Sequence, residues 1–115
     1  MLAVDDDKDL LQSIYSQFAA EGFEVDTALD GDIALQLLED HTYDIVLLDL
    51  KMPRMDGLTV LEEMKKLKKF PNVIVLTAVH DIPTALECLR IGAKDYITKP
   101  YDPEELLQII RRVLI

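Results

Sequence analysis

The chain has 115 residues, with 12 basic against 22 acidic side chains and a formal net charge of −10 at pH 7. This excess of negative charge opposes direct binding to nucleic acid and attraction to anionic lipid surfaces. A single cysteine excludes an internal disulfide, and with only two histidines the composition argues against a Cys/His zinc site. No apolar run approaches the roughly 20 residues that span a bilayer, and no signal peptide is evident, so we expect a cytoplasmic protein.

Short apolar runs alternate along the chain with longer segments whose apolar residues recur at helical spacing, which predicts successive βα units. The five predicted strands are Leu2–Val4, Phe23–Thr27, Ile45–Leu48, Val73–Leu76 and Tyr96–Thr98. The five amphipathic stripes lie within Leu10–Phe18, Ile33–Leu38, Leu58–Leu67, Ile82–Leu89 and Leu106–Leu114. A chain of this length holds one hydrophobic core, so we expect one domain over residues 1–115.

Residues at the segment boundaries supply ordinary helix signals. Asp56, Asp81 and Asp102 stand where the N-caps of the last three helices are expected. The basic run Lys65–Lys69 is assigned to the last turns of the third helix, where cations favour the helix dipole. We interpret this run as a solvated face rather than a nucleic-acid site.

The composition of the strands predicts their order in a parallel sheet. Strands covered by helices on both faces are continuously apolar, whereas partly exposed strands alternate. The runs LAV, IVLL and VIVL are continuous, while FEVDT alternates and DYIT is mixed, so the second and fifth strands are expected at the edges. With right-handed crossovers between neighbours, this predicts a doubly wound α/β fold of the flavodoxin-like (βα)5 type with strand order 2-1-3-4-5.

Acidic residues follow two strands that this order makes adjacent. Asp5, Asp6 and Asp7 come directly after the first strand, and Asp49 follows the third. Two carboxylates about 4 Å apart repel by roughly 4 kcal/mol at an effective dielectric near 20, so the cluster must protonate, separate or hold a cation. Oxygen ligands with open positions suit Mg²⁺, and the chain lacks the spacing of a calcium loop. Asp7 and Asp9 are interpreted as caps of the first helix rather than as ligands.

Two further polar residues, Thr77 and Lys99, end strands at the same edge of the sheet. A carboxylate such as that of Asp49 can attack phosphorus and form an acyl phosphate. Phosphoryl transfer then needs positive charge and hydrogen-bond donors around the phosphoryl oxygens, which the Lys99 ammonium and the Thr77 hydroxyl would supply. Taken singly, Thr77 could merely cap a turn and Lys99 could merely pair with surface acids. Their combination at the ends of separate strands predicts a phosphoryl-acceptor site.

Four sequence blocks resemble one known family. They are VDDD at Val4–Asp7, LLDLKMPRMDG at Leu47–Gly57, LTA at Leu76–Ala78 and GAKDYITKP at Gly92–Pro100. Together they resemble the receiver domain of two-component response regulators, and the resemblance runs through the whole chain.

The resemblance implies a role for each matching residue. Asp49 would be the phosphoacceptor, with Asp5 and Asp6 as the acidic pair that organises Mg²⁺ and Asp6 as the more direct ligand. Lys51 would offer its backbone carbonyl to the metal, while its side chain would modulate dephosphorylation. The bond between Lys99 and the proline that follows it would be cis.

The family also implies partners and a readout. The phosphoryl group would come from a sensor histidine kinase, a phosphotransfer protein or a small phosphodonor. Thr77 and Tyr96 would act as switch residues that alter the surface of the fourth helix, fifth strand and fifth helix, although Tyr96 could simply be a half-buried edge-strand aromatic. That surface would control an output domain or effector and could form a homodimer. Such a receiver is a signalling domain that supplies catalytic groups for its own phosphorylation and dephosphorylation.

Other functions remain open at this point. An aspartate-nucleophile phosphatase or phosphotransferase commonly carries a second acid two residues after the nucleophile, where this chain has Lys51. A flavodoxin-like cofactor module would have a glycine-rich phosphate loop after the first strand, where this chain has an acidic run. A receiver-like interaction module that is never phosphorylated is the third alternative.

Overall fold

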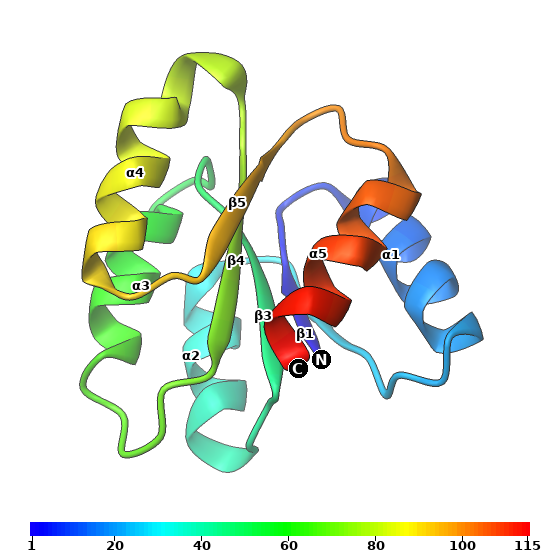
Figure 1. Ribbon diagram of the computed structural model, residues 1–115. Coiled ribbons are helices and arrows are strands. Elements are labelled where there is room, and N and C mark those ends of the chain that lie inside the picture. The colour runs from blue at the N-terminus through cyan, green and yellow to red at the C-terminus, as the bar shows by residue number, and fades with distance from the viewer.

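The computed structural model describes residues 1–115, in which strands and helices alternate along the chain (Figure 1). The strands are β1 (Leu2–Val4), β2 (Asp26–Ala28), β3 (Ile45–Asp49), β4 (Asn72–Thr77) and β5 (Asp95–Thr98). The α-helices are α1 (Lys8–Ala20), α2 (Gly31–Asp40), α3 (Gly57–Met64), α4 (Ile82–Ile91) and α5 (Pro103–Leu114), and a short 3₁₀ turn, η1 (Val79–Asp81), precedes α4.

The strands form one parallel sheet in the order β2-β1-β3-β4-β5, so the predicted order and fold class are confirmed. The chain winds outward in both directions from β1 and β3, which lie side by side. Because all strands run the same way, the residues that follow them meet at one edge of the sheet.

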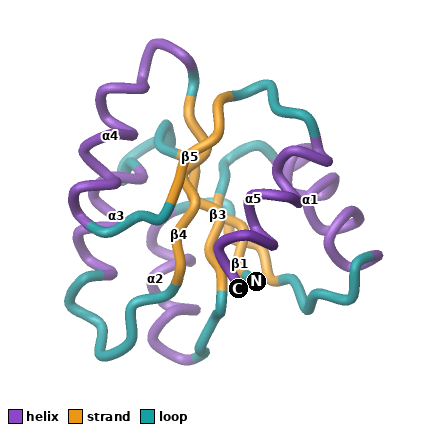
Figure 2. Tube along the Cα trace, in the orientation of Figure 1, coloured by secondary structure: helices purple, strands orange, loops and turns teal.

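Helices cover both faces of the sheet, with α1 and α5 on one face and α2, α3 and α4 on the other (Figures 1 and 2). Alternate strand residues therefore enter different cores. Leu2 and Val4 belong to the cluster beneath α2–α4, whereas Ala3 between them belongs to the cluster beneath α1 and α5. This two-sided burial explains the continuous apolar runs LAV, IVLL and VIVL within the central strands β1, β3 and β4.

The second strand is shorter and lies later in the chain than predicted. We expected Phe23–Thr27, but the strand begins at Asp26, which pairs with Leu2. The partner strand β1 has only three residues, which limits the regular ladder. Phe23 instead packs edge-on against Phe18 of α1, with ring centroids 5.6 Å apart, so its apolar character reflects core packing rather than strand pairing.

Two boundary predictions are also corrected. The third helix ends at Met64, so Lys66–Lys69 lie in the following turn rather than in its last turns. Asp56 and Asp102 accept the expected backbone hydrogen bonds as N-caps, but Asp81 occupies the N-cap position of α4 without any such bond from its side chain. None of the helices combines the length and apolar character needed to cross a membrane.

Candidate functional site

A cleft of about 230 Å³ lies at the carboxyl ends of the strands, on either side of the β1–β3 junction. Its lining combines residues from four strand ends and the loops that follow them: Asp5, Asp6, Asp7, Asp49, Leu50, Lys51, Thr77, Ala78 and Lys99. The structure thus brings together every residue that the sequence predicted for the acceptor and metal roles. Tyr96, predicted as a switch residue, is half-buried on β5 and packs against the core beneath α2–α4.

Three carboxylates converge in this cleft. One oxygen from each of Asp5, Asp6 and Asp49 lies within 4.8 Å of the others. Asp5 and Asp49 are buried, with 1% and 4% of their surfaces exposed, whereas Asp6 is exposed. The Asp5 carboxylate is also held in place by the backbone, because it accepts a hydrogen bond of 3.0 Å from the N–H of Asp7.

The Lys99 ammonium joins two of these carboxylates. Its Nζ lies 2.7 Å from Asp5 Oδ2 and 3.1 Å from Asp49 Oδ1, so it pairs with buried acids rather than surface ones. Burial lowers the pKa of Lys99, but the hydrogen bond to Asp5 and the charges of Asp49 and Asp5 outweigh burial and raise that pKa above its usual value. The lysine therefore remains a fixed positive charge.

Burial of Asp49 raises the pKa of this carboxyl to about 6, and the nearby Asp5 charge acts in the same direction. The ammonium of Lys99 and a backbone N–H from Lys51 oppose the shift. Without further positive charge, Asp49 is thus only partly ionised in mildly acidic solution. A cation in the cleft would favour its ionised, nucleophilic form.

The donor set fits a divalent cation. With all groups ionised, the three carboxylates and the Lys99 ammonium leave two uncompensated negative charges, which one divalent ion balances. All the available ligand atoms are oxygens, the preference of Mg²⁺, and the exposed side of Asp6 leaves room for retained waters.

Local packing fixes the backbone that carries Asp49. Gly57, the first residue of α3, donates its N–H to Leu50 O at 3.0 Å. A Cβ at Gly57 would collide with the carbonyl oxygen of Asp49 and come within 2.8 Å of Leu50 Cα. The glycine therefore lets α3 begin directly against the end of β3, and its place in the sequence block MDG reflects this close approach.

Thr77 at the end of β4 and Lys99 after β5 complete the lining of the cleft. Thr77 is 1% exposed, and its Oγ1 donates a hydrogen bond of 3.1 Å to Ala78 O. The Lys99–Pro100 peptide bond is cis, as the resemblance implied. The Thr77 and Asp49 side chains line the same cleft.

Asp81 is a residue at this edge whose role the sequence did not reveal. Its Oδ1 lies 3.6 Å from Lys51 Nζ, and its buried Oδ2 has no hydrogen-bond partner. The sequence around Asp81 signals a helix cap, and nothing in it indicates a partner on the β3–α3 loop. Only the packing of that loop against η1 brings the two residues together.

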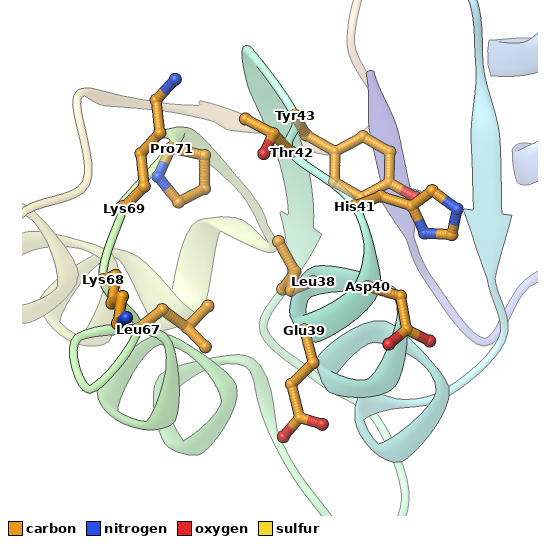
Figure 3. Close-up of a pocket in the computed structure, with 10 residues that line it drawn as sticks. All are labelled: Leu38, Glu39, Asp40, His41, Thr42, Tyr43, Leu67, Lys68, Lys69 and Pro71. Carbon is orange, nitrogen blue, oxygen red and sulfur yellow. The ribbon is translucent and has the colours of Figure 1, made fainter.

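A second cavity lies at the opposite edge of the sheet. It measures about 320 Å³ and lies where β3 and β4 begin, between the segment 38–43 and the α3–β4 loop (Figure 3). Glu39 and Asp40 line one side and Lys68 and Lys69 the other. This cavity is remote from the acidic cleft and contains none of its residues.

The fold and cleft together define a doubly wound α/β protein with an acidic site at its β1–β3 junction. The model of the family described as "Response regulator receiver domain" matches residues 1–111, and the chain belongs to this family. It is 42% identical over 114 residues to the regulatory protein AtoC of Escherichia coli, covering 99% of this chain and 25% of AtoC. It is 39% identical over 111 residues to the transcriptional regulatory protein DltR of Streptococcus agalactiae, covering 96% of this chain and 50% of DltR.

Solved structures agree with this family. The receiver domain of NtrX from Brucella abortus superposes with a TM-score of 0.92 at 35% identity, covering 98% of this chain and 96% of that one. The chemotaxis protein CheY4 of Vibrio cholerae gives a TM-score of 0.89 at 33% identity, with 98% and 96% covered. The chain spans between a quarter and about half the length of the curated relatives it matches.

Proposed function

We propose that residues 1–115 act as one receiver unit whose Asp49 accepts a phosphoryl group in a cytoplasmic two-component pathway. The donor is the phosphohistidine of a sensor histidine kinase or phosphotransfer protein, or a small phosphodonor. The observation that carries this proposal is the buried Asp49 carboxylate, which lies 3.1 Å from the Lys99 ammonium and beside two further acids. A nucleophile, a positive charge and a cation-binding cluster are thus combined in one open cleft.

In the transfer step, an ionised oxygen of Asp49 forms the new bond to phosphorus. The bond from phosphorus to the donor nitrogen or oxygen breaks, and the electron pair leaves with the donor. Lys99 balances charge on the phosphoryl oxygens, and Thr77 donates its hydroxyl to one of them. In dephosphorylation, water bonds to phosphorus, the bond to Asp49 breaks, and phosphate and the free carboxylate are released.

We assign the metal site to the carboxylates of Asp5, Asp6 and Asp49 and to the backbone carbonyl of Lys51. When bound, Mg²⁺ reduces the repulsion between these acids and an incoming phosphate. Lys99 contacts both the acceptor Asp49 and Asp5, and the Asp7 N–H also holds the Asp5 carboxylate in place.

The proposed output of the switch is a change in the surface formed by α4, β5 and α5. Thr77 and Tyr96 lie on the adjacent strands β4 and β5, so movement of the hydroxyl can be coupled to the aromatic ring. The relatives AtoC and DltR are named as regulators and are longer than this chain. We therefore propose control of an output domain or effector protein, with a homodimer through α4–β5–α5 as one form of that control.

Intact mass after incubation with acetyl phosphate tests the proposal. One added phosphoryl group is expected with Mg²⁺, and none is expected with a chelator or in the variant Asp49→Asn. Asp40→Asn, a matched change on an exposed aspartate of α2, should be phosphorylated like the unmodified chain. Phosphoryl addition to Asp49→Asn would show that another residue is the acceptor.

A further inference from the structure

Asp81 is the one N-cap aspartate of the five α-helices that does not cap its helix. Asp7, Asp30, Asp56 and Asp102 each accept a backbone N–H with the side chain and have extended backbones, with ψ between 105° and 170°. Asp81 has ψ 9° and closes the 3₁₀ turn η1. Extended backbone at the N-cap is what lets the side chain reach the first turn of a helix, so η1 prevents capping of α4.

The Asp81 carboxylate faces basic groups instead. Its Oδ1 lies 3.6 Å from Lys51 Nζ, and its Oδ2 lies 3.5 Å from Nε2 of His80 without a hydrogen bond. The Asp81 side chain is only 11% exposed, whereas that of Lys51 is 73% exposed. A largely buried acid is therefore compensated only by a weak ion pair with an exposed lysine.

Lys51 connects this acid to the phosphoryl-acceptor cleft. The residue lines the cleft beside Asp49, and its backbone N–H acts on the Asp49 carboxylate. A phosphoryl group on Asp49 brings nearly two negative charges into the cleft, whereas the Asp81 carboxylate carries one. The phosphoryl group then competes with Asp81 for the same ammonium.

We propose that Lys51 and Asp81 form a two-state link between Asp49 and the start of α4. In one state Lys51 pairs with Asp81 and η1 is formed. In the other, Lys51 turns to the phosphoryl group, η1 unwinds, and Asp81 caps α4. The link rests on the proposed function for its trigger, because phosphorylation of Asp49 supplies the competing charge.

The second state makes a specific structural prediction. An N-cap side chain bonds the second or third N–H of its helix, and in α4 the second position is Pro83, which has no N–H. Thr84 is therefore the single amide that Asp81 can bond. Hydrogen exchange at Thr84 and the backbone Cα shift of Asp81 report the two states directly.

Three variants separate the link from a structural effect. In Lys51→Gln, Asp81 loses its ion pair and should become extended, so that Thr84 exchange slows by roughly fivefold, the effect of one cap bond. Asp81→Asn, which caps helices as well as aspartate but cannot pair with a cation, should slow Thr84 equally. Asp81→Ala can do neither and should leave Thr84 exchange fast, as should the distant charge control Lys68→Gln.

These variants are measured by NMR without phosphorylation, and the unmodified chain is measured with Mg²⁺, before and after beryllium fluoride, a phosphoryl mimic. The link is supported if Lys51→Gln and Asp81→Asn change the amide exchange rate of Thr84 in the same direction as beryllium fluoride does. It is overturned if Asp81 keeps its turn conformation in Lys51→Gln, or if Asp81→Ala slows Thr84 as much as Asp81→Asn. If acetyl phosphate adds no phosphoryl group while the two variants still slow amide exchange at Thr84, the proposed function fails and the coupling of Lys51 to Asp81 stands.

Discussion

Replacement of Asp49 by asparagine is expected to stabilise the metal-free protein at neutral pH. Folding raises the pKa of this carboxyl to about 6, from an ordinary value of about 4, because it buries the group beside Asp5. Ionisation is therefore harder in the folded chain than in the unfolded chain. Asparagine keeps the shape and the oxygen that accepts from Lys99 but removes the charge that must be buried.

The magnitude follows from the size of the shift. Two pKa units correspond to roughly 3 kcal/mol, and solvent at the open side of the cleft reduces the expected gain to about 1–2 kcal/mol. For a domain of this length, each kcal/mol raises the melting temperature by about 4 °C.

The sign of the pH dependence is fixed by the same shift. Because the pKa of Asp49 is higher in the folded chain than in the unfolded chain, burying the ionised carboxylate costs stability. This cost is absent below about pH 4 and complete above about pH 7. The difference in unfolding free energy between Asp49→Asn and the unmodified chain should therefore grow as the pH rises through 6. Mg²⁺ at a hundredfold excess over its Kd would stabilise the unmodified chain by about 2.7 kcal/mol and reduce or reverse the difference.

Urea unfolding followed by circular dichroism, at pH 4 to 7.5 with EDTA or Mg²⁺, measures these quantities. Asp40→Asn, on an exposed residue, should change stability by less than about 0.5 kcal/mol across the series. An Asp49→Asn variant no more stable than the unmodified chain at pH 7 in EDTA would refute the account of a strained, charge-crowded cleft.

Three further substitutions test other parts of the structure. Lys99→Ala leaves two buried carboxylates without their counter-charge, so labelling by acetyl phosphate should slow by about 10²-fold or more. Circular dichroism should still show a folded chain. An unchanged labelling rate would show that the lysine has no part in the site. Gly57→Ala forces a Cβ against backbone and should cost about 1–3 kcal/mol in urea unfolding, more than Gly31→Ala, whose new Cβ meets side-chain atoms and no backbone. Tyr43→Phe removes the 2.6 Å hydrogen bond to Asp26 and should cost about 1 kcal/mol at pH 7. Burial, followed by the Asp26 contacts, raises the pKa of Tyr43, so this difference should disappear as the pH rises above 10 and through the folded pKa; a constant difference would exclude the contact.

The sequence determined the architecture because strand burial leaves a direct compositional record. The runs LAV in β1, IVLL in β3 and VIVL in β4 are continuously apolar, as expected for strands between two helical layers, and this pattern predicted their central places in the sheet. Once the order was set, parallel geometry placed Asp5 and Asp49 at adjacent strand ends. The acidic cleft follows from those two facts.

Tertiary structure decided the features that depend on contacts between distant segments. Phe23 has the pattern of a strand residue but packs against Phe18, because the local signal for an apolar residue is the same in both settings. Asp81 carries every local signal of a helix cap, yet its carboxylate lies beside Lys51 from a loop 30 positions earlier in the chain. Side-chain type and spacing record which residues are buried or end a helix, but the choice between competing partners is made only when the loops pack together.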